Sequence, residues 1–125
     1  MTVYLDTHVV VWLYAGAVEL LSDRAREVIE GADLLVSPMV PLELEYLFEA
    51  GRTTEHGEAI VDYLERTMGL DICDASFRHV ARLAATLRWT RDPFDRIIVA
   101  HAMSRESLLL TKDRSIRESY TRAVW

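Results

Sequence analysis

The sequence predicts an α/β protein: a single three-layer α/β/α domain over residues 1–125, with a central, mostly parallel sheet of four to five strands. Two observations lead to this class. Short apolar runs alternate with longer stretches in which apolar residues recur at helical spacing. The chain has 125 residues, half of them apolar, which is enough for one domain with a proper core. Such alternation is typical of a parallel sheet covered by helices on both faces.

The first element is a buried strand at Thr2–Leu5 that ends at Asp6. The run that follows, up to Gly16, is ambiguous because its three valines also favour a strand. One continuous strand through both runs would carry Asp6, Thr7 and His8 in its middle, where burial of polar groups is costly. We therefore predict a strand, a turn at Asp6 and Thr7, and a short helix that Gly16 ends.

The middle of the chain continues the alternation. Ser22 is a good N-cap residue and Gly31 a good helix stop, so 22–32 is predicted as a helix. A strand follows at 33–37, and the next helix, 38–51, has prolines at its head and a glycine at its end. The elements beyond it are a helix at 54–69, a strand at 70–73, helices at 76–89 and 92–106, a strand at 107–111, a short helix at 115–120 and an edge strand at 122–125.

Composition limits the compartment. No apolar run approaches the roughly 20 residues of a membrane span, and no basic segment opens the chain as in a secretory signal. The single cysteine, Cys73, permits no internal disulfide and has apolar neighbours, as expected of a core thiol in a reducing compartment. We therefore expect a cytoplasmic protein with no membrane partner.

Charge is unevenly distributed. The net charge of −6 argues against a nucleic-acid binder that relies on bulk electrostatics. Segment 41–71 holds eight acids against two arginines, whereas segment 75–91 holds four arginines and no acid. The basic segment could contact a phosphate backbone beside a metal-charged pocket. Equally, Arg78 and Arg82, at i and i+4, could form an ordinary solvated helix face.

Two carboxylates three residues apart, Asp92 and Asp95, begin the apolar segment 92–102. Taken alone, the segment is explained by helix initiation. Asp92 suits the N-cap, Pro93 the first helical position, and Asp95 the positive end of the helix dipole. The remaining acids of the chain decide whether Asp95 does more than this.

Four acids are expected at one edge of the sheet, because ligands of open parallel sheets bind beyond the carboxyl ends of the strands. Asp6 ends the first strand, Asp113 follows the strand at 107–111, Asp95 begins a helix that packs on the sheet, and Glu43 borders the core near the start of a helix. Singly, each could be a cap or a surface charge. Together they would repel one another unless a cation were present. Their hard oxygen ligands predict Mg²⁺ or Mn²⁺ rather than zinc.

These segments resemble the PIN-domain ribonucleases, and specifically the VapC toxins of bacterial toxin–antitoxin pairs. The matching pieces are "YLDTHVVVWL", "SPMVPLELEYL", "RDPFDRIIVAHA" and "LLLTKD", in this order and spacing along almost the whole chain. The resemblance implies a metal-dependent endoribonuclease whose acidic quartet falls on Asp6, Glu43, Asp95 and Asp113. It implies that Asp6 and Asp95 are the principal metal ligands, with Glu43 and Asp113 binding directly or through water, and that the products carry a 5′-phosphate and a 3′-hydroxyl.

Further residues have expected supporting roles. Asp92 is expected to cap its helix and to act as an accessory acid, and Thr7, Ser37 and Thr111 are candidates to bond a carboxylate or a water, although Ser37 and Thr111 could also be caps. Three cations beside the acids are candidates for RNA phosphate contact: Arg91, Arg96 and Lys112. Arg96 could instead form a structural ion pair.

The resemblance also implies partners: a VapB-like antitoxin that occludes the site, an RNA substrate, and a second copy in a homodimer. Exposed apolar surface on the first two long helices would serve the protein contacts. A catalytically silent module of the same fold, which only binds RNA or protein, remains the alternative. Haloacid-dehalogenase chemistry needs a second Asp two residues after Asp6, where the chain has His8. A response-regulator receiver would use Asp74 as acceptor, but the paired acids that it needs after the first strand are missing.

Overall fold

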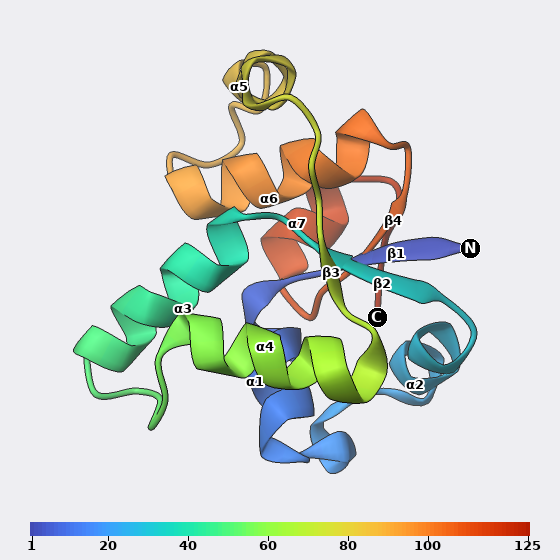
Figure 1. Cartoon of the computed structure of the whole chain (residues 1–125). Helices are drawn as coiled ribbons and strands as arrows, with labels where there is room; N and C mark the ends of the chain where they lie inside the picture. Colours follow the sequence, from blue (N-terminus) through green and yellow to red (C-terminus); the bar gives the residue numbers. More distant parts are fainter.

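A five-stranded sheet surrounded by helices forms the protein in a computed structural model that describes residues 1–125 (Figure 1). The strands are β1 (Thr2–Leu5), β2 (Asp33–Val36), β3 (Asp71–Ile72), β4 (Leu108–Leu110) and β5 (Ala123–Val124). The helices are α1 (Thr7–Ala15), α2 (Asp23–Glu30), α3 (Met39–Glu49), α4 (Gly57–Met68), α5 (Phe77–Ala85), α6 (Pro93–Ser104) and α7 (Arg114–Ser119), with a 3₁₀ turn, η1, at Val18–Leu20. The predicted α/β class is confirmed.

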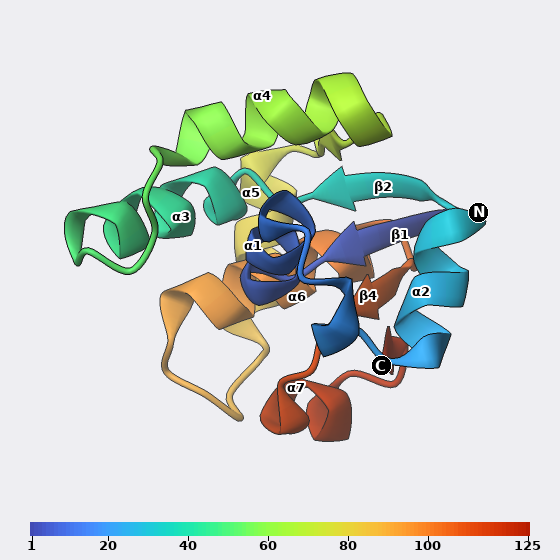
Figure 2. The same ribbon diagram turned by 90° about the horizontal axis from the view of Figure 1, so that it is seen from below.

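The sheet has the strand order β3-β2-β1-β4-β5, and every pair is parallel, so it is entirely rather than mostly parallel. Helices α5 and α6 lie on one side of it, and α1, α2 and α4 lie on the other (Figures 1 and 2), which confirms the three layers. From β1 the chain moves outward through β2 to β3 and then returns to β4, on the other side of β1. This reversal creates a switch point at the carboxyl ends of β1 and β4.

Local signals in the sequence explain most helix boundaries. Gly16 ends α1 with a φ of 69°, a left-handed conformation that glycine adopts readily. The predicted helix 76–89 ends early, at Ala85. The last turn tightens, with the Thr86 N–H donating to the carbonyl of Leu83 and the Leu87 N–H to that of Ala84, and Arg96 of α6 donates further hydrogen bonds to the carbonyls of Ala84 and Ala85. The longest helices, α4 and α6, have 12 residues each, and none is long and apolar enough to cross a membrane.

The first residue of α4 has to be glycine. A Cβ at Gly57 would collide with the carbonyl oxygen of Pro41 and crowd the backbone nitrogen of Glu45, both in α3. We expect Gly57→Ala to lower the free energy of unfolding by about 1–3 kcal/mol, because backbone cannot yield as a side chain can. Gly31→Ala is the matched control, since a Cβ there meets only ordinary contact at 3.7 Å. Equal urea midpoints for the two variants would contradict this packing.

Candidate active site

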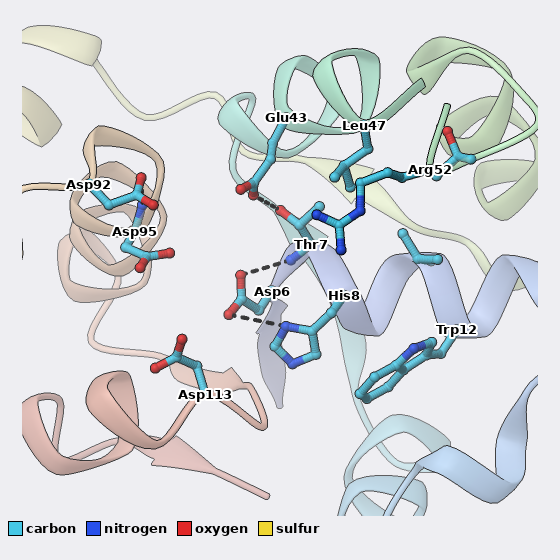
Figure 3. A pocket seen from close by; sticks show the side chains of 12 residues that line it. Asp6, Thr7, His8, Trp12, Glu43, Leu47, Arg52, Asp92, Asp95 and Asp113 are labelled. Carbon is cyan, nitrogen blue, oxygen red and sulfur yellow. Dashed lines mark hydrogen bonds and ion pairs between the residues drawn. The ribbon is translucent and has the colours of Figure 1, made fainter. Parts of the chain in front are cut away.

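A pocket of about 420 Å³ lies at the carboxyl edge of the sheet, at the switch point. Twelve residues line it, and five of them are acids that come from four separate segments of the chain (Figure 3). The acids are Asp6, Glu43, Asp92, Asp95 and Asp113. The structure therefore brings together the four acids that the sequence predicted to converge, and adds Asp92 to them.

Asp6 is fixed at the end of β1 and is only 4 % exposed. Its Oδ1 accepts a hydrogen bond from the Thr7 N–H at 2.8 Å, and its Oδ2 accepts one from the Thr111 hydroxyl at 2.7 Å. Two donors, one just after β1 and one just after β4, thus hold the carboxylate in one orientation. Each oxygen keeps a further lone pair that can bind a cation.

Glu43 projects from α3 toward Asp6, and its side chain accepts a hydrogen bond from the buried Thr7 hydroxyl (Figure 3). Burial raises the pKa of Glu43, and the charges of Asp6 and Asp92 raise it further, although the bond from Thr7 acts in the opposite direction. A carboxyl group in this position can accept a proton at a pH closer to neutrality than an exposed glutamate can. Thr7, predicted as an accessory residue, does contact a site carboxylate.

Asp92 and Asp95 have different roles at the start of α6. Asp92 is the N-cap: its Oδ1 accepts hydrogen bonds from the Phe94 N–H at 2.8 Å and, more weakly, from the Asp95 N–H at 3.4 Å. Asp95 is directed into the pocket (Figure 3). Burial and, to a smaller extent, the charges of the four other site acids together raise the pKa of Asp95 to about 7.

Asp113 caps α7 by accepting a hydrogen bond from the Ile116 N–H at 3.0 Å, so its predicted capping role is real. It also lines the acidic pocket. The fully buried Thr111 joins Asp113 to Asp6, because its hydroxyl donates to Asp6 and accepts a hydrogen bond from the Asp113 N–H at 3.0 Å. One hydroxyl group therefore sets the positions of two site acids.

Comparison with known proteins identifies the family. The family model described as PIN domain matches residues 3–120. The chain belongs to the PIN-domain family. It is 32% identical over 123 residues to Ribonuclease VapC22 of Mycobacterium tuberculosis. The matched region covers 93% of this chain and 90% of that protein. The predicted resemblance to PIN-domain proteins of the VapC kind is thereby confirmed.

Solved structures share this PIN fold. VapBC2 from Rickettsia felis, bound to a DNA fragment from its promoter, matches with a TM-score of 0.62 and 21% identity over 95% of this chain and 93% of that one. A toxin–antitoxin complex from Klebsiella pneumoniae matches with a TM-score of 0.66 and 15% identity over 98% and 96%. At these identities the matches establish the fold.

The donor set of this PIN domain fits a hard divalent cation. No three of its acidic, histidine or cysteine side chains form a ready-made coordination group. Mg²⁺, however, keeps several waters and binds proteins through one or two carboxylates, so a partial set is sufficient. Part of the rise in the pKa of Asp95 comes from neighbouring carboxylates, and a cation would relieve that repulsion. The metal itself stays a prediction.

Three of the predicted site residues, Ser37, Arg91 and Arg96, do not line the acidic pocket of the PIN domain. Ser37 is fully buried, hydrogen-bonds His101 at 2.8 Å and caps the start of α3, so it bonds no carboxylate. Arg91 and Arg96 line a separate shallow pocket against α5. The guanidinium of Arg96 donates hydrogen bonds to the carbonyls of Ala84 and Ala85 at the end of α5 and forms no ion pair. The guanidinium of Arg96 is therefore bound to the end of α5, and its contact with an RNA phosphate stays a prediction.

Sequence reasoning missed six residues that line the PIN pocket, and three of them carry a charged, titratable or aromatic side chain: His8, Trp12 and Arg52. The Nε2 of His8 accepts a hydrogen bond from the Lys112 N–H at 2.9 Å, which assigns the proton of the neutral ring to Nδ1, 3.7 Å from Asp6. Burial lowers the pKa of His8, against the opposing effect of Asp6 and Asp113. The position of His8, two residues after Asp6, was the only feature of the sequence that indicated a place in the site.

Proposed function

We propose that the chain is an Mg²⁺- or Mn²⁺-dependent endoribonuclease that acts as the toxin of a toxin–antitoxin pair. The observation that carries the proposal is the convergence of five carboxylates on one pocket, with the pKa of Asp95 raised to about 7. So much negative charge at one point is costly unless the site has a cation to hold. The similarity to Ribonuclease VapC22 supports RNA as the substrate.

In this proposal Asp6 and Asp95 would hold the ion, and Glu43 and Asp113 would bind it directly or through water. The ion would supply a water of lowered pKa and stabilise the charge that develops on the phosphate oxygens. Glu43, which its hydrogen bond with Thr7 orients, would accept a proton from the attacking water. Cleavage would leave a 5′-phosphate and a 3′-hydroxyl.

The proposed partners are a VapB-like antitoxin and a second copy of the chain. The VapBC complexes that share the fold support the first. Large apolar side chains on α3 and α4 are available for such contacts: Leu42 is 45 % exposed, Tyr46 54 % and Tyr63 43 %. Exposed apolar groups of this size on neighbouring helices are typical of protein-binding surfaces.

Incubation of total bacterial RNA with the purified protein tests the proposal. We expect discrete fragments in Mn²⁺ or Mg²⁺, none in chelator, and none from Asp95→Asn. Asp62→Asn is the matched control, because Asp62 is exposed on α4 and does not line the pocket. Fragments that persist with Asp95→Asn would refute the assigned site.

A selective nuclease could lack its target in that RNA, so metal binding is measured in parallel. We expect calorimetry to detect Mn²⁺ binding to the wild type and to Asp62→Asn, and at least tenfold weaker binding to Asp95→Asn. If RNA stays intact and no metal binds, the catalytic proposal fails and the chain is a binding module.

A further inference from the structure

The pocket has two chemically different ends. Five acids occupy one end. The other end has none and is lined by residues of α1, of α3 and of the loop after α3: Val11, Trp12, Leu47, Arg52 and Thr53. Figure 3 shows Arg52 and Trp12 on the side of Asp6 that faces away from Asp92 and Asp95. The acids themselves repel phosphate, so the protein side chains that can add affinity for an RNA strand lie at this second, acid-free end.

Arg52 is the only cation that lines the pocket. The ion pairs of the protein are all formed by other residues, so its guanidinium has no acidic partner. The loop holds its backbone firmly: Gly51 turns the chain with a φ of 73°, and the Arg52 N–H donates to the carbonyl of Leu47 at 2.8 Å. Figure 3 shows the guanidinium turned into the pocket toward Thr7. A planar group with five donors is well suited to a phosphate.

Trp12 supplies the second component, an aromatic surface. It belongs to a cluster in which its ring lies 5.0 Å from that of His8 and 5.8 Å from that of Trp125. The Nζ of Lys112 lies 5.9 Å from the Trp12 ring, which adds positive charge. These neighbours fix the position of the indole, and the partly buried Trp12 side chain lines the pocket. Nucleobases of single strands stack on aromatic side chains placed in this way.

We propose that the acid-free end of the pocket binds one nucleotide of single-stranded RNA next to the cleaved bond, with its base stacked on Trp12 and its phosphate bound by Arg52. This inference rests on the proposed function and names the form of its substrate. A guanidinium and an indole together match a nucleotide, which is an anion joined to a flat ring. The base has to leave its own stack to reach Trp12, so a loop or an unpaired strand is bound in preference to a duplex.

Binding of two fluorescent pentanucleotides tests the inference, one of adenosines and one with the same ribose-phosphate backbone but no bases. Both are titrated into the Asp95→Asn protein, so that cleavage does not consume the probe. We expect Trp12→Leu to weaken binding of the adenosine probe about tenfold and to leave the abasic probe unchanged. Trp12→Phe, which keeps an aromatic face, should retain most of the affinity. Arg52→Ala should weaken both probes and reduce the salt dependence of log affinity by about 0.7.

Two control variants lie outside the pocket: Arg66→Ala on α4 and Phe77→Leu on α5, both with exposed side chains and both expected to bind as the parent does. If Trp12→Leu weakens the two probes equally, Trp12 is structural and the inference fails. If Trp12→Leu weakens neither probe, the surface serves another partner, such as a protein, and the inference also fails. The outcome is independent of catalysis. A nuclease without this subsite would cleave RNA but show no difference between the probes, and a silent module with it would show the difference but not cleave.

Discussion

Thr111→Val is expected to weaken Mn²⁺ binding by about 10- to 100-fold, although Thr111 is fully buried and lines no part of the pocket surface. The Thr111 hydroxyl donates to Asp6 at 2.7 Å and accepts the Asp113 N–H at 3.0 Å. Valine has nearly the same shape but neither function. It leaves Asp6 with only one of its two donors, the Thr7 N–H, and leaves the partly buried Asp113 N–H without an acceptor, so we also expect a loss of about 1–3 kcal/mol in stability.

Thr111→Ser distinguishes the effect of the hydroxyl group from that of the methyl group. Serine keeps the hydrogen bonds and loses only a methyl group, so metal affinity should stay within about threefold of wild type while stability falls slightly. Calorimetric titration with Mn²⁺ on all three proteins makes the comparison. Equal affinity of the valine and serine variants would show that Thr111 does not position Asp6.

The sequence predicted the acids well because each stands at a boundary that has its own local signal. Asp6 and Asp113 follow apolar runs, and Asp95 follows a proline that marks a helix start. Parallel strands place all their carboxyl ends at one edge, so the topology converts these boundaries into one site. Glu43 needed a different argument, from its position beside the core, and the structure places it against Thr7.

The non-acidic part of the pocket could not be predicted in the same way. Arg52 lies in a loop, and its direction depends on Gly51 and on the packing of α3, which the sequence pattern does not reveal. In the sequence, Trp12 is one more apolar residue of a short predicted helix. Trp125, its neighbour in space, is 113 positions away along the chain. The direction of the Arg96 side chain could not be predicted for a related reason. Proximity to Asp95 in the sequence indicated a phosphate contact, but the side chain turns toward α5.

Replacing Asp95 with Asn is expected to stabilise the metal-free protein at pH 8 while it removes activity. The pKa of Asp95 is raised from 3.8 to about 7 by burial and by four neighbouring carboxylates. The folded state therefore keeps this proton to a higher pH than the unfolded state does. Stability attributable to Asp95 is full below about pH 4 and is lost as the pH rises to about 7. Asparagine carries no charge and does not incur this loss.

The expected gain at pH 8 is about 1–2 kcal/mol, or roughly 3–8 °C in melting temperature, after allowance for solvent screening of a half-buried group. The gain should shrink toward zero as the pH is lowered to 4, because the carboxyl group is then neutral in both states. Saturating Mn²⁺ should reverse the order, since a cation stabilises only the site that binds it. Thermal melts from pH 4 to pH 8, with and without Mn²⁺, measure both effects. A constant difference between the two proteins at every pH would show that Asp95 carries its charge at no cost, and the acids would then not be poised for a cation.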